Sequence, residues 1–214
     1  MADKKGLFIV LEGGEGVGKT TNSAFIQQYL KDKAIAFQTS REPGGTELAE
    51  KIRALILDKH SENVSDMTEL LLVFAARAQH LQEKVLPVMA SGQWLLCDRF
   101  TDATYAYQGG GRQMDKTLIN QLEQLVQNDL RPDLTIILDA PIEVGRARAE
   151  ARAELDRLES EAAAFHQRVR DAYLERANQQ PDKYAVVNAN QPLDKVQKDL
   201  AVVLDHVISQ WINA

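Results

Sequence analysis

The residues of this chain that most directly indicate chemistry lie at positions 13–20, which read Gly-Gly-Glu-Gly-Val-Gly-Lys-Thr. They match the phosphate-binding loop pattern G-x-x-x-x-G-K-[ST] at every fixed position. The glycines let the backbone turn tightly and aim its N–H groups at a phosphate, and a following helix N-terminus adds partial positive charge. Lys19 can reach the β- and γ-phosphates, and the Thr20 hydroxyl suits Mg²⁺. We therefore predict a nucleotide site that includes Gly13, Gly14, Glu15, Gly16, Val17, Gly18, Lys19, Thr20 and Thr21.

The segments on either side of this loop have the pattern that the motif requires. Residues 7–11 form a short apolar run that is typical of a buried parallel strand. Residues 20–30 place Phe25, Ile26 and Tyr29 on one face of a helix. The loop is therefore expected between a strand and a helix.

Strand-like and helical segments alternate along the rest of the chain, which predicts an α/β fold with a parallel sheet flanked by helices. We expect further strands at residues 35–39, 94–98, 134–139 and 184–187. We expect helices at residues 47–58, 66–91, 115–128, 141–179 and 193–212, with a break near residues 154–156. No repeat, low-complexity tract or linker interrupts this pattern, so we expect one domain over residues 1–214.

Bulk composition excludes several classes of protein. The chain has 214 residues, 44% of them hydrophobic and 26% charged, and a net charge of −6, so no broad basic surface for nucleic acid is expected. No apolar run approaches the length of a membrane span, and the first residues lack the apolar core of a signal peptide. The single cysteine, Cys97, lies in an apolar run and cannot form an intrachain disulfide. We expect a cytoplasmic protein that binds neither nucleic acid nor membrane.

Three motifs fall at the carboxyl ends of predicted strands, where parallel sheets bind ligands. They are the phosphate loop, residues 41–45 (Arg-Glu-Pro-Gly-Gly) and Asp98-Arg99. Asp98 resembles the acidic residue on the Mg²⁺ side of phosphate-loop proteins, and the planar fork of Arg99 suits a phosphate. A second arginine-bearing site beside a Mg²⁺–nucleotide loop favours phosphoryl transfer onto another phosphate. A regulatory GTPase or a nucleotide-dependent interaction module remains as an alternative, but the sequence has no Asn-Lys-x-Asp motif and no Asp-x-x-Gly motif after the loop.

Taken together, six stretches resemble the bacterial thymidylate kinase family, in order and over nearly the whole chain. They are residues 41–46 (REPGGT), 74–77 (FAAR), 98–99 (DR), 106–112 (AYQGGGR), 131–133 (RPD) and 154–157 (ELDR). The resemblance implies a five-stranded parallel sheet, phosphate-loop NTPase-like, and a homodimer. It also implies Mg²⁺-dependent transfer of the γ-phosphoryl group of ATP to dTMP. Another nucleoside-monophosphate kinase is the alternative within the enzymes, because only the base pocket distinguishes them.

The resemblance also implies a role for individual residues. Lys19 and the loop amides would hold ATP, and Thr20 and Asp98 would hold Mg²⁺. Glu15 would meet the deoxyribose 3′-hydroxyl, and Tyr107 would crowd the 2′ position. Arg99 and Arg53 would approach the dTMP phosphate. The expected base pocket consists of Pro43, Phe74, Arg77, Thr104 and Gln108.

A lid at about residues 146–160 is expected to supply the catalytic arginine, because the loop has none between Glu15 and Lys19. Arg152 and Arg148 are the candidates, although a solvated helix with i,i+4 ion pairs would explain most charges of this segment.

The sequence also departs from the family. Val73 stands where an aromatic residue usually stacks on thymine, with Phe74 one position later, and Phe100 and Ala103 replace the usual residues after Asp98-Arg99.

Overall fold

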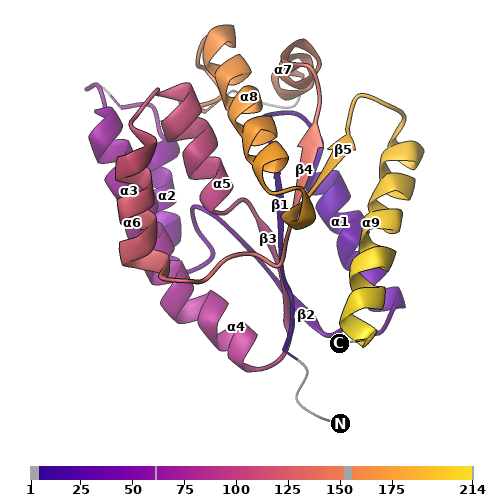
Figure 1. Ribbon diagram of the computed structural model, residues 1–214. Coiled ribbons are helices and arrows are strands. Elements are labelled where there is room, and N and C mark those ends of the chain that lie inside the picture. The colour runs from indigo at the N-terminus through magenta and orange to yellow at the C-terminus, as the bar shows by residue number, and fades with distance from the viewer. Residues whose placement is uncertain (1–4, 61, 152–155, 214) are drawn as a thin grey trace.

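The computed structural model describes residues 5–60, 62–151 and 156–213. Its centre is a parallel sheet of five strands in the order β2-β3-β1-β4-β5. The strands are β1 (Phe8–Gly13), β2 (Phe37–Arg41), β3 (Trp94–Asp98), β4 (Leu134–Asp139) and β5 (Tyr184–Asn188). This arrangement confirms the predicted fold class, and Figure 1 shows helices on both faces of the sheet.

The central strand β1 is buried along its whole length, because helices cover both faces of the sheet. Ile9 and Leu11 face one side, where they pack in a cluster with residues of α1 (Lys19–Asp32) and α9 (Leu193–Asn213). Phe8 and Val10 face the other side, against residues from the segment 81–88. The alternation of side chains along a strand therefore gives β1 two apolar faces and one core on each side.

The predicted helix at residues 66–91 is interrupted. It consists of α3 (Asp66–His80), a π-helical segment η1 (Leu81–Val85) and α4 (Leu86–Ala90). Pro87 in α4 lacks the N–H that an unbroken α-helix would bond to the carbonyl four residues earlier, and its ring would press on that carbonyl. The wider turn of η1 lies immediately before this position.

Residues 101–111 are helical, which the sequence analysis did not predict. The segment consists of α5 (Thr101–Thr104) and a second π-helix, η2 (Tyr105–Gly111), which packs against α8 (Ala163–Gln179). A Cβ on Gly110 would lie 2.7 Å from the backbone oxygen of Arg168 in α8, so glycine is required for this close approach. The glycine run of the sequence therefore serves helix packing.

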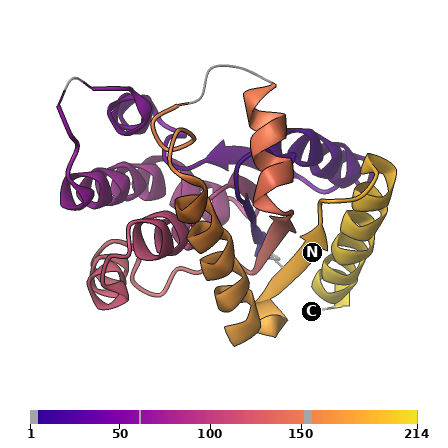
Figure 2. The same ribbon diagram turned by 90° about the horizontal axis from the view of Figure 1, so that it is seen from above.

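The predicted helix at 141–179 is also divided. The structure has α7 (Ile142–Glu150) and α8, with turns over residues 156–161, and residues 152–155 lie outside the described part of the chain. Figure 2 shows α7 above the strand ends, between α8 and α1. The other predicted strands and helices are present with small shifts at their ends, including α2 (Glu47–Leu57) and α6 (Lys116–Gln127). A short helix, η3 (Pro181–Lys183), precedes β5.

Within the described ranges, no helix combines the length and apolar composition that crossing a bilayer requires.

Candidate active site

A large cavity of about 790 Å³ opens at the carboxyl ends of the strands, as expected for a parallel sheet. Its volume lies within the usual range for a small-molecule site. Sixteen of the site residues expected from the sequence line it: Glu15, Gly16, Val17, Gly18, Lys19, Thr20, Thr21, Pro43, Arg53, Arg77, Asp98, Arg99, Thr104, Tyr107, Gln108 and Arg148. The structure thus brings residues from six separate segments of the sequence together around one space.

The phosphate loop leaves β1 and enters α1 through glycines with positive φ. Gly13, Gly16 and Gly18 have φ values of 140°, 66° and 90°, a region that side chains disfavour. A Cβ on Gly16 would also collide with the backbone of Gly145 in α7, so the loop packs directly against that helix. The loop amides therefore converge above the start of α1, as an anion site requires.

Lys19, the first residue of α1, folds back over the loop. Its Nζ donates to the carbonyl oxygens of Gly13 at 3.0 Å and Gly14 at 2.7 Å. Burial lowers the pKa of Lys19 to about 8, and the positive charge of Arg99 acts in the same direction. A bound anion would favour the charged ammonium form.

Arg99 links the phosphate loop to the opposite wall of the cavity. It follows β3 with φ at 68°, and its guanidinium donates to Glu15 Oε1 at 2.5 Å and to the Gly13 carbonyl at 3.0 Å. Tyr107 donates to the same Glu15 oxygen at 2.5 Å. Burial opposes ionisation of Glu15, but the charges of Arg99 and Lys19 outweigh it and lower the pKa to about 2. Glu15 is therefore an acceptor of hydrogen bonds at neutral pH.

A second buried arginine lies at the other end of the cavity. Arg77 in α3 is 1% exposed, and it donates to Glu42 at 2.7 Å and to the Thr104 hydroxyl at 2.9 Å. Burial opposes ionisation of Glu42, but the charge of Arg77 and the hydrogen bond from His80 lower its pKa. Glu42 therefore also accepts from His80 Nδ1 at 2.8 Å, and this carboxylate is held from two sides. The Nη1 atom of Arg77 is buried and has no hydrogen-bond partner among the residues that the structure describes. An unpaired buried donor is costly, so a ligand acceptor here would relieve it.

Asp98 and Thr20 have the donor set that Mg²⁺ prefers. Both line the cavity, and they contribute a carboxylate and a hydroxyl oxygen. Asp98 Oδ1 is buried and, within residues 5–60, 62–151 and 156–213, has no hydrogen-bond partner. An orphaned buried carboxylate oxygen beside a phosphate loop fits a hydrated divalent cation, so these residues are compatible with the predicted metal site.

Three expected residues do not line the large cavity. Gly13 and Gly14 line a smaller neighbouring cavity behind the loop. Phe74 packs with Leu70, Tyr105 and Ile119, and its ring lies 4.9 Å from the guanidinium carbon of Arg77. Val73 lines the large cavity at the position where the family has an aromatic residue. One step along a helix turns the side chain by about 100°, which separates the two neighbours.

The segment at about residues 146–160, which was expected to form a lid, begins in α7 and ends in the turns that precede α8. Arg148 lines the cavity and its Nη1 donates to the carbonyl of Ala189 at 3.3 Å. Arg146 instead pairs with Glu150 at 3.6 Å. Arg152, the other expected catalytic arginine, lies outside the described residues.

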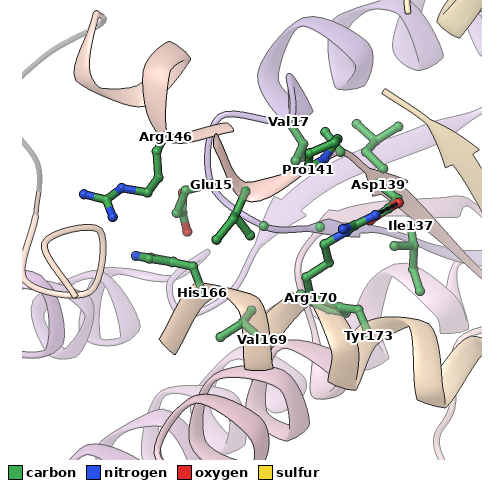
Figure 3. Close-up of a pocket in the computed structure, with 15 residues that line it drawn as sticks. Glu15, Val17, Ile137, Asp139, Pro141, Arg146, His166, Val169, Arg170 and Tyr173 are labelled. Atoms are coloured by element: carbon green, nitrogen blue, oxygen red, sulfur yellow. Dashed lines mark hydrogen bonds and ion pairs between the residues drawn. The ribbon is translucent and has the colours of Figure 1, made fainter. Parts of the chain in front are cut away.

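The smaller cavity, of about 30 Å³, has room for about one water molecule. Figure 3 shows Glu15, Arg146 and His166 at one end, and the ion pair between Arg170 and Asp139 at the other. His166 is 7% exposed, and its Nε2 has no hydrogen-bond partner within the described part of the chain. No pattern of metal ligands in the sequence singled this histidine out.

Glu12, beside the phosphate loop on β1, is a buried hydrogen-bond acceptor that joins separate elements around the site. Its Oε1 accepts from the backbone N–H groups of Phe100 at 2.7 Å and Ala103 at 3.2 Å, and its Oε2 accepts from the Tyr173 hydroxyl at 2.7 Å. Burial raises the pKa of Glu12 to about 7, and the charge of Asp102 acts in the same direction. Tyr173, whose hydroxyl also accepts from Arg99 at 3.1 Å, gave no signal in the sequence.

Glu12→Gln should remove a pH dependence of stability. The folded pKa of about 7 exceeds the ordinary value of 4.5, so the folded state binds more protons between these values. The free energy of unfolding then falls as pH rises through this window, by at most about 1.4 kcal/mol per pH unit. Urea unfolding at about pH 5 and pH 7.5 should show the parent losing stability relative to Glu12→Gln; identical changes in the two proteins would contradict the raised pKa.

Comparison with known proteins agrees with this geometry. The family model described as thymidylate kinase matches residues 11–200. A thymidylate kinase of Alcanivorax borkumensis is 53% identical over 202 residues, covering 94% of this chain and 97% of the relative. One of Ectopseudomonas mendocina is 55% identical over 203 residues, covering 95% and 97%. The crystal structure of thymidylate kinase from Ehrlichia chaffeensis superposes with a TM-score of 0.74 at 31% identity, covering 94% of this chain and 99% of that one. The chain belongs to the thymidylate kinase family.

Proposed function

We propose that the large cavity binds ATP at the phosphate loop and dTMP at the opposite end, and that this chain, acting as one kinase domain, transfers the phosphoryl group in line between them. The overall reaction, ATP-dependent phosphorylation of dTMP to dTDP, follows from membership of the family. The assignment of residues rests on one observation: Lys19 and Arg77 line the same cavity. One space can then hold a nucleotide phosphate at one end and the acceptor base at the other, with the acceptor phosphate between them.

At the donor end, Lys19 exchanges its carbonyl partners for the β- and γ-phosphates of ATP, and the loop amides bind the remaining oxygens. Asp98 and Thr20 would hold Mg²⁺, which when bound neutralises charge on the phosphate oxygens. The buried, unpaired Oδ1 of Asp98 supports this assignment. The chain's own contribution is to position the phosphates and offset their charge.

At the acceptor end, Arg99 and Arg53 bind the dTMP phosphate. Arg53 is half-buried and donates to the Pro43 carbonyl at 2.9 Å. Glu15 accepts from the sugar 3′-hydroxyl, because its lowered pKa keeps it ionised. The hydrogen bond from the Tyr107 hydroxyl to Glu15 holds the Tyr107 side chain in place. In that place it occupies the space that a ribose 2′-hydroxyl would need. Arg77, Thr104, Gln108 and Pro43 then surround the base.

Alanine substitutions should separate the two ends of the site. Lys19→Ala should lower the single-turnover rate by at least about 10²-fold while leaving dTMP affinity near the parent value. Arg99→Ala should weaken dTMP binding by about 1.5–3 kcal/mol, because it removes a charge-assisted contact. Calorimetric titration with dTMP and rapid-quench kinetics check the two effects, with Arg131→Ala, outside the cavity, as the control. Parental dTMP affinity in Arg99→Ala would remove Arg99 from the acceptor site.

The lid supplies the arginine that the phosphate loop lacks. Arg148 lines the cavity and donates a long hydrogen bond to the Ala189 carbonyl, a partner that it can exchange for the transferring phosphoryl group. Arg152, on the same segment, is the second candidate. An arginine placed at such a transition state can contribute about 10³–10⁵ in rate.

Single-turnover rates of three variants test the lid assignment. Arg148→Ala or Arg152→Ala should lower the rate by at least about 10²-fold. Arg146→Ala should have a smaller effect, because Arg146 pairs with Glu150 on the helix surface. Near-parental chemistry in both Arg148→Ala and Arg152→Ala would rule out a lid arginine as the stabilising group.

A homodimer in the cytoplasm is the assembly that we propose. Exposed apolar side chains on the packed helices α2 and α3 support it: Leu48, Leu55, Met67 and Leu71, each about half exposed. Leu71→Glu would place a charge in a self-complementary interface and should shift the protein to monomer. Sedimentation equilibrium measures this, with Leu125→Glu on α6 as the matched control. A dimer as tight as the parent in Leu71→Glu would exclude this face.

A further inference from the structure

Glu69 is a buried carboxylate that the reaction scheme above does not use. Glu69 lies in the first turn of α3 and is fully buried. Its Oε1 accepts from Gln108 Nε2 at 2.8 Å and from Arg112 Nε at 3.3 Å. Its Oε2 accepts from Arg157 Nη2 at 2.6 Å and from Arg112 Nη2 at 3.2 Å. One carboxylate thus connects three parts of the fold. They are α3, the π-helix η2 together with Arg112 directly after it, and the segment after α7 that contains Arg157.

These contacts make Glu69 an ionised acceptor. Burial opposes ionisation, but hydrogen bonds from Arg112 and Gln108 outweigh it and lower the pKa of Glu69. A carboxylate without a proton accepts hydrogen bonds and cannot donate them. Gln108 must therefore present its amide N–H₂ to Glu69, which fixes which way its amide points.

Because the amide nitrogen is directed to Glu69, the side-chain carbonyl oxygen is the end of the Gln108 amide that is left to meet a ligand. Gln108 is 2% exposed and lines the cavity together with Arg77. Arg77 offers an unpaired donor at Nη1, and Gln108 offers an acceptor at Oε1. The imide edge of thymine carries an O4 acceptor beside an N3–H donor, which complements this pair. Cytosine has a donor and an acceptor in the reverse places.

We propose that Glu69 is a positioning residue for base selection: it orients the Gln108 amide so that the cavity accepts an imide base and rejects cytosine. This inference rests on the proposed placement of the acceptor base between Arg77 and Gln108. Glu69 also anchors the far wall of the cavity through Arg157, whose Nε donates to the Ile56 carbonyl at 2.8 Å. Asp156 and Leu158, on either side of Arg157, line the cavity. The carboxylate therefore fixes both the amide and the wall beside the base.

Glu69→Gln tests the inference because an amide can either accept from Gln108 or donate to it. Both orientations of the Gln108 amide then become available, and the selectivity between imide and cytosine bases is lost. The ratio of kcat/KM for dTMP to that for dCMP should fall by roughly tenfold or more. The ratio of dTMP to dUMP should stay at the parent value, because uracil has the same imide edge. KM for ATP should also stay unchanged, because a general loss of structure would alter it.

A double-mutant cycle shows whether Glu69 acts through Gln108. Gln108→Leu alone should lower the dTMP-to-dCMP ratio, and adding Glu69→Gln should lower it no further. Glu161→Gln is the matched control: it removes the ion pair of Arg112 with Glu161 at 2.5 Å and leaves Gln108 untouched, so its ratio should equal that of the parent. Where thermal melting shows Glu69→Gln unfolded, Glu69→Asp takes its place, since it keeps the charge but withdraws the oxygen from Gln108.

Three outcomes would overturn the inference, and they differ in which other parts of the proposal they contradict. A parental dTMP-to-dCMP ratio in the Glu69 variant, with a lowered ratio in Gln108→Leu, would exclude Glu69 and leave the base site in place. Parental ratios in both variants would also remove Gln108 from the base site and so contradict that part of the proposed function. A further fall in the ratio of the double variant would show that Glu69 acts by another route.

Discussion

The arrangement of the site depends on one buried carboxylate at the end of the central strand. Glu12 accepts hydrogen bonds from Phe100 and Ala103 at the start of α5, and from Tyr173 in α8. Under the proposed function these two helices would carry the acceptor wall and the base of the lid, while the next residue of β1 begins the phosphate loop. Burying a carboxylate is costly unless it is well paired, so these three donors must stay close to it. The spacing between the donor and acceptor ends follows from that requirement.

Arg99 extends the same constraint into the cavity. Its positive φ of 68° is a conformation that most side chains avoid, and it turns the chain sharply after β3. The guanidinium bonds to Gly13 of the loop, Tyr173 of α8 and Glu15. These contacts offset the backbone strain and fix the guanidinium where two phosphates would meet. Strain at this residue therefore serves preorganisation, since the side chain needs little rearrangement to bind an anion.

Much of this site could be predicted from local pattern, and the parts that could not depend on packing between distant elements. The phosphate loop and strand ends are local, and parallel topology places them at one edge of the sheet. The helical form of residues 101–111 was missed because its glycines suit a turn as well as a helix that approaches α8 closely. Phe74 was expected in the base pocket, but the helical rotation places Val73, and not Phe74, on the cavity wall. Glu69 looks in sequence like an exposed acidic residue at a helix N-terminus, and only the fold brings Arg112 and Arg157 to it.

The cations of the site already have partners, which bears on selectivity. Lys19 is bonded to loop carbonyls, Arg53 to the Pro43 carbonyl and Arg99 to Glu15. A substrate must replace these contacts, so it gains only the difference between its own interactions and those it displaces. A dianionic phosphate can outcompete a carbonyl or share Arg99 with Glu15, whereas the hydroxyl of an unphosphorylated nucleoside cannot. Glu15 would then also accept a hydrogen bond from the sugar hydroxyl. The internal contacts that stabilise the cavity without ligands would thus also make binding selective for an acceptor that carries a phosphate charge.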